Sequence, residues 1–499
     1  MTDTDDDTPD LVLFEGRNLN LSVDMVLRPK DMASKPKTDP VEEIKQVDAI
    51  QCGSEARKQF GFADGYRNLN HGQCFGELCS QNDNIDTSIG SFGTYPLAVR
   101  KAFRYYQELS EERPDAFIRY DYPKLLDQSR QAVADYLHAP VEGCVFVSNA
   151  TTGINTVLRG LVYQPGDVIV YFATIYGACG KTVSYITETT PAESRKIEYT
   201  YPVSDKELCN SFERAIEEIR AEGKNPRIAI YDTIASLPGV RMPFEELTKL
   251  CRKHKVVSCV DGAHSVGGIP MNIRELDPDF YVSNCHKWLY VPRGCAIFYV
   301  AERNHHLIRS TLPTSHGFEP RPVQGEAALP NPLPPSAKTP FITNFEFVGT
   351  MDNSPFLCVP GAIEWRKKIR WNDLSGDEAI YAYNAHIARE AGELLASKFG
   401  TEVMENEEQT LTKCVFSNVR LPLSFQNDAH GNVDEAIKIA QWIAKTLVEE
   451  YDTFIAIIFY GDAFWVRLSG QVYLTLEDFE WAAETLLALC EGVRSGLWR

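Results

Sequence analysis

Short apolar segments alternate with longer amphipathic segments between Val141 and Val300. The short segments are rich in β-branched residues, which is typical of buried strands, and the longer ones have helical spacing. We expect strands at Val145–Val147, Asp167–Phe172, Arg227–Tyr231, Val256–Val260, Phe280–Val282 and Cys295–Val300, with helices such as Lys206–Glu222 and Pro243–His254 between them. This alternation predicts an α/β fold with a mostly parallel, doubly wound sheet, which binds ligands at the carboxyl ends of its strands.

A second, smaller α/β region is expected after a proline-rich stretch. The segment Pro320–Pro340 predicts a long surface loop. Beyond it, Glu378–Phe399 and Glu435–Tyr451 have helical patterns, and Phe454–Phe459 and Phe464–Leu468 have strand patterns. We therefore expect a flexible N-terminal extension (residues 1–60), an N-terminal segment (61–135), a large domain (136–345) and a small C-terminal domain (346–499).

Two parts of the N-terminal region lack a regular pattern. Residues 1–60 have weak periodicity and begin with an Asp/Thr run, which favours a flexible, solvated tail. Gln73–Gly90 looks like an insertion, because Asn68–Gly72 reads naturally into Ser91–Pro96. A retained intron in the gene model and an ordinary lineage-specific loop both explain such a segment.

Composition and charge narrow the class of protein. The 499 residues are 44% hydrophobic and 24% charged, with a formal net charge of −19. This is ordinary globular composition, and the negative charge argues against a nucleic-acid partner. The chain shows no secretory signal and no apolar run of the roughly 18 residues that span a bilayer, so we expect a cytoplasmic protein without membrane contact. The 13 cysteines lack zinc-type spacing, which predicts free thiols and no metal site.

Two residues that follow neighbouring expected strands carry the side chains of pyridoxal 5′-phosphate (PLP) chemistry. Asp261 follows Val256–Val260, and Lys287 follows Phe280–Val282. The carboxyl ends of parallel strands meet at one edge of a sheet, so both side chains can enter one crevice. A lysine amine holds PLP as a Schiff base and moves protons at the substrate Cα, while a carboxylate keeps the pyridine nitrogen protonated. Either residue alone is more often a surface charge or a cap, but the pair predicts a PLP enzyme.

Two further positions suit the same cofactor. Thr151 and Thr152 lie between the expected strand Val145–Val147 and a helix running to about Leu161. Helix-start amides and threonine hydroxyls together can bind a phosphate, although a simple helix cap explains the same residues. Tyr176 follows the next strand and could stack on the pyridine ring, or be a buried core tyrosine.

At these residues the sequence resembles the class V aminotransferase family, in particular its fungal isopenicillin-N-epimerase-like branch. Within that branch it is similar to hercynylcysteine sulfoxide lyase and to the loline-cluster PLP enzyme. The resemblance runs from about Tyr66 to the C-terminus, apart from Gln73–Gly90. It implies PLP fold type I, as in aspartate aminotransferase, with a homodimer and a small amino-acid substrate. The family includes desulfurases, lyases, epimerases and transaminases, so the resemblance specifies the cofactor better than the reaction.

The resemblance also implies a role for each matching residue. Lys287, Asp261 and His264 would form the catalytic set, with Lys287 bound to PLP and Asp261 at the ring nitrogen. The remaining roles are Ser236 with His264 near the ring hydroxyl, Thr151, Thr152 and His286 at the phosphate, Tyr176 stacked on the ring, Thr350 at the phosphate across a dimer interface, Arg467 at the substrate α-carboxylate and Asn70 beside the substrate. Without the resemblance, Thr350 would be interpreted as a turn residue and Arg467 as part of a surface ion pair.

Two departures from the family bear on the reaction. The lyases carry a cysteine shortly before a Tyr-Pro pair, whereas this chain has Lys196 ahead of Tyr201 and Pro202. A lysine cannot replace a thiol in sulfur chemistry. The insertion Gln73–Gly90 also interrupts a stretch that borders the substrate pocket in the family.

Three hypotheses for the function follow. The leading one is a carbon–sulfur lyase that works by β-elimination, of the hercynylcysteine sulfoxide lyase type. The second is an aminotransferase-like or C–C/C–N bond-forming enzyme of fungal secondary metabolism, which Lys196 favours. The third is a non-catalytic PLP-binding protein whose site the insertion has compromised.

Overall fold

A computed structural model describes residues 38–70, 93–321, 323–325, 332–334 and 336–499. The expected insertion Gln73–Gly90 lies outside the described residues, as do residues 1–37. The residues from Pro40 to Arg499 form one compact unit.

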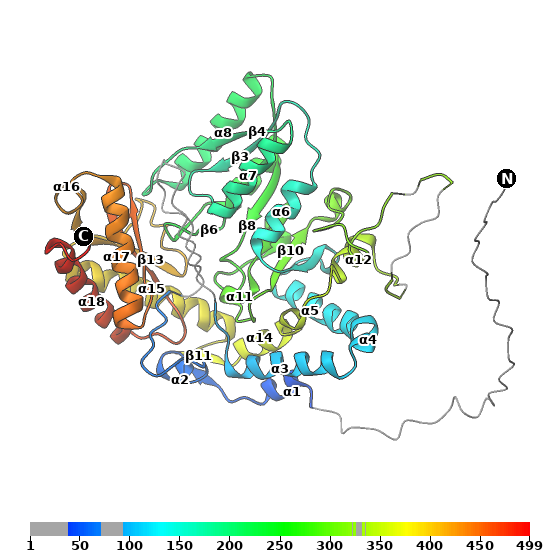
Figure 1. The fold of residues 1–499 in the computed structure, drawn as a ribbon, viewed down its shortest axis with the longest axis horizontal. Helices are drawn as coiled ribbons and strands as arrows, with labels where there is room; N and C mark the ends of the chain where they lie inside the picture. The colour runs from blue at the N-terminus through cyan, green and yellow to red at the C-terminus, as the bar shows by residue number, and fades with distance from the viewer. Residues whose placement is uncertain (1–37, 71–92, 322, 326–331, 335) are drawn as a thin grey trace, which may run out of the picture. The chain divides into compact units, whose positions relative to one another are not determined.

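A seven-stranded sheet with the order β2-β10-β9-β8-β5-β3-β4 lies at the centre of this unit (Figure 1). Its strands are β2 (Cys144–Val147), β3 (Asp167–Phe172), β4 (Glu193–Ile197), β5 (Asn225–Asp232), β8 (Val257–Asp261), β9 (Phe280–Ser283) and β10 (Ala296–Val300). β10 pairs antiparallel with β2 and β9, and the other neighbours pair parallel. The mostly parallel α/β sheet is confirmed. β4 is the strand of this sheet that the sequence pattern did not predict.

The strands of this sheet other than the edge strand β4 are buried on both faces, which explains their apolar runs. In β3, Val168, Val170 and Phe172 belong to one core cluster and Ile169 belongs to another. Alternate side chains of a strand point to opposite faces, so helices cover the sheet on both sides. The helices of this region are α6 (Ala150–Gly160), α7 (Gly177–Thr189), α8 (Asp205–Ala221), α9 (Phe244–His254), α10 (Ile273–Leu276) and α11 (Cys285–Trp288), with a small hairpin of β6 (Ile234–Ala235) and β7 (Val240–Arg241).

The expectation of a flexible extension up to residue 60 does not hold from Pro40 onward. This part contains α1 (Pro40–Lys45), β1 (Ile50–Gln51) and α2 (Ser54–Arg57), and β1 pairs parallel with β11 (Ile369–Trp371). Ile44, Ile50 and Phe60 are buried in the main core, which fixes a segment whose sequence shows little periodicity. It is followed by α3 (Leu97–Glu112), α4 (Pro114–Ala116), a π-helical turn (Phe117–Asp121), α5 (Tyr122–Tyr136) and a 3₁₀ turn (Val141–Gly143).

A second sheet with the antiparallel order β13-β15-β14 lies near the C-terminus (Figure 1). Its strands are β13 (Phe416–Ser424), β14 (Ala456–Tyr460) and β15 (Ala463–Ser469). The other elements after β10 are a 3₁₀ turn (Glu302–Leu307), α12 (Pro340–Glu346), α13 (Ser354–Leu357), α14 (Val359–Arg366), β12 (Leu374–Ser375), α15 (Gly376–Phe399), α16 (Phe425–Asp428), α17 (Val433–Tyr451) and α18 (Leu476–Arg494). The seven-stranded sheet falls within residues 136–345 and this sheet within 346–499, but the domain boundaries themselves stay a prediction.

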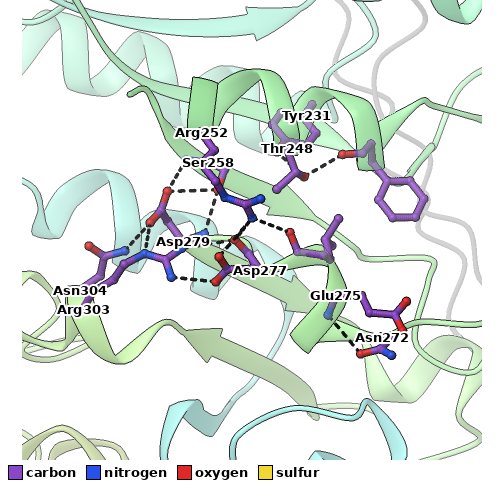
Figure 2. Close-up of polar contacts among 12 residues, drawn as sticks. Tyr231, Thr248, Arg252, Ser258, Asn272, Glu275, Asp277, Asp279, Arg303 and Asn304 are labelled. Atoms are coloured by element: carbon purple, nitrogen blue, oxygen red, sulfur yellow. Dashed lines mark hydrogen bonds and ion pairs between the residues drawn. The ribbon is translucent and has the colours of Figure 1, made fainter. Parts of the chain in front are cut away.

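Polar side chains tie together the amino ends of β8 and β9, opposite the edge where ligands are expected (Figure 2). Asp279 Oδ2 accepts hydrogen bonds from the Ser258 amide at 3.0 Å and the Ser258 hydroxyl at 3.2 Å. Its Oδ1 accepts from Arg303 Nε at 2.9 Å and Asn304 Nδ2 at 2.8 Å. This network fixes the start of the two strands whose carboxyl ends carry Asp261 and Lys287.

Within the described residues, no helix is long and apolar enough to cross a membrane. The described residues of the proline-rich stretch form neither helix nor strand before Pro340 begins α12, as the sequence predicted.

Candidate active site

Asp261 and Lys287 lie at the carboxyl edge of the large sheet. Asp261 is the last residue of β8 and stands in register with Val282 of β9, which leads into the short helix α11 that carries Lys287. Both side chains are 3% exposed. The structure thus brings the predicted pair together in a buried place, where a charge needs a partner.

The amine of Lys287 contacts His264. Its Nζ lies 3.1 Å from His264 Nε2, and Trp288 Nε1 donates to His264 Nδ1 at 3.3 Å. The Trp288 hydrogen bond and the Lys287 contact together hold the imidazole ring of His264 in place beside the lysine amine.

The carboxylate of Asp261 receives hydrogen bonds on both oxygens. Oδ1 accepts from the Ala263 amide at 3.0 Å, and Oδ2 accepts from Cys179 Sγ on α7 at 3.4 Å. Burial raises the pKa of Asp261, and the Ala263 amide, the positive charge of Lys287 and the Cys179 thiol oppose that rise. Burial and the nearby Asp261 raise the pKa of Cys179 well above its usual value, so Cys179 stays a thiol and a hydrogen-bond donor.

The amino end of α6 is the predicted phosphate site. Asn149 caps this helix by accepting from the Thr152 amide at 2.8 Å, and the Thr152 hydroxyl lies 2.9 Å from Ser148 Oγ. The Ala150 amide donates to Asn284 Oδ1 at 2.8 Å, which ties α6 to the end of β9. A Cβ on Gly153 would lie 2.6 Å from Val282 Cγ2, so only glycine allows this close packing. Thr151 and Thr152 are half-buried in the first helical turn, where the helix dipole favours an anion.

His286 and Tyr176 flank this region. His286 Nδ1 lies 2.9 Å from the Cys295 carbonyl oxygen and donates to it. Burial, with the nearby Lys287 charge, lowers the pKa of His286 to about 4, so the ring is neutral and a phosphate dianion beside it would favour its protonation. A Cβ on Gly93 would lie 1.8 Å from the His286 carbonyl oxygen, so glycine is required beside α11. Tyr176 is the half-buried N-cap residue of α7, and its stacking on the ring stays a prediction.

Arg467 extends from β15, the central strand of the small sheet, to the edge of the large sheet. Its Nη1 donates to the Ser236 carbonyl oxygen at 2.7 Å, and its Nη2 donates to Asn70 Oδ1 at 3.1 Å. The guanidinium lies 4.0 Å from the Phe416 ring centroid. Arg467 is fully buried, so it does not form the surface ion pair that sequence alone would suggest. The structure therefore brings Ser236, Asn70 and Arg467 together.

Thr350 is exposed in the segment between α12 and α13, and none of the contacts among the described residues joins it to the site. Sequence reasoning missed three buried residues: Cys179, Asn284 and Asp232, the last residue of β5. For Asp232 a signal was available, because this residue ends a strand next to β8 just as Asp261 does. For Cys179 and Asn284 the sequence carries no such signal, because packing between elements sets their hydrogen-bond partners.

The arrangement fits PLP. It supplies a buried amine beside a carboxylate and a helix amino end with hydroxyl groups. Ser236 Oγ is buried and has no hydrogen-bond partner among the described residues. A buried hydroxyl without a partner is costly, which agrees with a polar ligand at this place.

The sequence profile described as Aminotransferase class-V matches residues 105–351. A similar protein is the "L-cysteine desulfhydrase-like protein lolT1" of Epichloe uncinata, which is 39% identical over 434 residues. The match covers 83% of this chain and 95% of that protein. The chain belongs to the class V aminotransferase family.

Two further proteins are similar over most of this chain. Hercynylcysteine sulfoxide lyase of Schizosaccharomyces pombe is 29% identical over 438 residues, covering 88% of this chain and 98% of that protein. The apo cysteine desulfurase of Thermococcus onnurineus has a TM-score of 0.65 at 17% identity, covering 89% of this chain and all of that one. The fold is PLP fold type I, and this class V family member is a PLP-dependent enzyme.

Proposed function

We propose that this enzyme is a carbon–sulfur lyase that eliminates a sulfur group from the β-carbon of an amino acid. The observation that carries the proposal is the buried contact between Lys287 and His264, because it orients the lysine amine at the sheet edge that also carries Asp261. The names of relatives support the reaction class: a desulfhydrase-like protein, a hercynylcysteine sulfoxide lyase and L-cysteine desulfhydrase of Arabidopsis thaliana.

PLP, when bound, supplies an electron sink for the negative charge that develops at the substrate Cα. Lys287 would bind the cofactor and then, as a free amine, take the Cα proton. Asp261 would keep the ring nitrogen protonated through its own negative charge. The Cβ–S bond breaks with its electron pair on sulfur, and hydrolysis of the remaining fragment gives pyruvate and ammonia.

The other predicted residues bind and orient the reactants. Thr151, Thr152 and His286 would hold the phosphate, and Ser236 would donate to the ring hydroxyl. The planar fork of Arg467 suits the substrate α-carboxylate. Because Arg467 is fully buried, the carboxylate would replace Asn70 Oδ1 on Nη2, and Asn70 would then face the substrate.

The described cysteines favour a lyase over an enzyme that moves sulfur onto its own thiol. Such a transfer needs an accessible thiolate. Burial raises the pKa of the two partly exposed cysteines, Cys52 and Cys209, to about 12, and the other described cysteines are buried. Cys74 and Cys79 lie outside the described residues. Elimination needs no thiol on the enzyme.

Lys196 supports a second candidate function, a bond-forming enzyme of fungal secondary metabolism. Its side chain is 46% exposed on the edge strand β4 and forms an ion pair with Glu198 at 2.6 Å. This position supplies no sulfur chemistry, so the enzyme differs from the lyases that carry a cysteine there.

The test is to incubate the holoenzyme with L-cysteine, S-alkyl-cysteines and their sulfoxides, and to measure pyruvate and ammonia. We expect equimolar release of both from at least one substrate, no release by Lys287→Ala, and unchanged release by Lys196→Ala. Retained PLP without release from any of these compounds would contradict the lyase proposal. A new product that keeps the amino group would then support the bond-forming alternative.

A further inference from the structure

Asp232 is a buried carboxyl group that the reaction described above does not use. It is 4% exposed and is the last residue of β5. In the parallel pairing of β5 with β8 it stands in register with Asp261. Residues in register on neighbouring strands point to the same face of a sheet, so the two carboxyl groups are neighbours.

The core residues show which face this is. Ile228 and Ile230 of β5 and Cys259 of β8 belong to the cluster that also contains Cys179 of α7. Side chains alternate along a strand, so Asp232 and Asp261 point toward this same side. Two carboxyl groups that lie next to each other in a buried site do not both carry a charge at neutral pH.

The surroundings of the two groups decide which one is charged. Asp261 accepts hydrogen bonds from the Ala263 amide and the Cys179 thiol. No hydrogen bond or ion pair joins the carboxyl group of Asp232 to another side chain among the described residues. We propose that Asp232 is a positioning residue that stays protonated in the folded enzyme, so that Asp261 alone carries the negative charge at the ring nitrogen of PLP.

The electrostatics of the site agree with this assignment. Burial and then the charge of Asp261 raise the pKa of Asp232 well above its usual value, and the Lys287 charge opposes the rise. The titratable groups that face Asp232 are Asp261 on β8, Lys287 on α11, Cys179 on α7, and Tyr199 and Tyr201 after β4. Burial raises the pKa of Cys179 and of both tyrosines, so these three groups stay neutral near pH 7.

The test compares Asp232→Asn with the wild-type holoenzyme between about pH 6 and about pH 9. A protonated carboxyl group resembles an amide, so the variant should keep PLP, measured as visible absorption after gel filtration. The folded wild type holds one proton more than the unfolded chain in this range, so its stability falls as pH rises, and Asn removes this dependence. The difference in unfolding temperature in favour of Asp232→Asn should therefore grow with pH.

Asp261→Asn is the matched control, and it should lose PLP affinity by about tenfold or more because it removes the charge at the ring nitrogen. Two results would overturn the inference: PLP loss in Asp232→Asn equal to that in Asp261→Asn, or a temperature difference that is the same at every pH. If the amide variant does not fold, Asp232→Leu provides the same comparison with an apolar side chain. The inference rests on PLP binding and not on the lyase reaction, so its readouts remain valid whatever substrate the enzyme takes.

Discussion

At the scale of single residues, the guanidinium of Arg467 is held from three sides. The Ser236 carbonyl and the Asn70 amide oxygen accept its hydrogen bonds, and the Phe416 ring packs against it. These contacts fix the orientation of a planar donor that can bind a carboxylate through two parallel hydrogen bonds. A lysine would keep the charge and lose this geometry.

Arg467→Lys should therefore lower kcat/KM by about tenfold to a hundredfold, mainly through a higher KM, because the shorter lysine ammonium does not reproduce the planar donor that faces the carboxylate. Visible absorption of bound PLP should not change. Arg420→Lys is a matched control on β13 of the same sheet, since Arg420 is 44% exposed and pairs with Glu402 at 3.0 Å. Steady-state kinetics that show equal effects for both variants would exclude Arg467 from substrate binding.

The sequence predicted the positions of some site residues but not the contacts of others. Lys287 and Asp261 follow strands with strong apolar patterns, so their place at one sheet edge could be derived from topology. The contact of Arg467 with Asn70 joins residues from opposite ends of the chain, and no local pattern specifies it. The thiol of Cys179 is aimed at Asp261 by the packing of α7 on the sheet, which the sequence does not show.

At the scale of elements, the start of β8 and β9 is fixed by Asp279, which accepts four hydrogen bonds from Ser258, Arg303 and Asn304 (Figure 2). Its side chain is 19% exposed. Asp279→Ala should lower the free energy of unfolding by about 2 to 3 kcal/mol, because it leaves the Ser258 amide and hydroxyl without their acceptor. Urea unfolding followed by circular dichroism measures this change.

Asp277→Ala is the control for this prediction. Asp277 is 44% exposed and pairs with Arg252 and Arg303, so its removal should cost under about 1 kcal/mol. A loss as large as that of Asp279→Ala would show that the surface ion pairs, and not the hydrogen bonds to Ser258, hold the strand ends together.

Elements buried on both faces were predictable, and exposed or short ones were not. The expected strand Asp167–Phe172 matches β3 residue for residue, because its apolar run is buried on both sides. β4 has the sequence Glu-Ser-Arg-Lys-Ile and lies at the sheet edge, where charged side chains face water and hide the strand pattern. The four-residue helix α11 is too short to show a helical period, although it carries Lys287.

At the scale of the whole molecule, the family implies a dimer, and Thr350 lies where a partner could be reached. It is exposed beside Met351, whose exposed fraction is 43%. The dimer is a prediction from the family resemblance.

We expect sedimentation to give a dimer and Met351→Asp to dissociate it, because the charge would be buried at the interface. Thr350→Ala should keep the dimer and weaken PLP binding by about threefold to tenfold, the loss of one hydrogen bond to a charged group. Val162→Asp is the control for Met351→Asp and should leave the dimer intact, since Val162 is 76% exposed in the segment after α6. A PLP-bound monomer would contradict the predicted role of Thr350.

The central claim is that Lys287 holds PLP, and mass spectrometry after borohydride reduction tests it most directly. Reduction turns the bond between the lysine and the cofactor into a stable amine, so the modified peptide can be sequenced. The account predicts one pyridoxyl group per chain, on the peptide that contains Lys287, and none in Lys287→Ala. A pyridoxyl group on another lysine, or on no lysine of the wild-type holoenzyme, would contradict it.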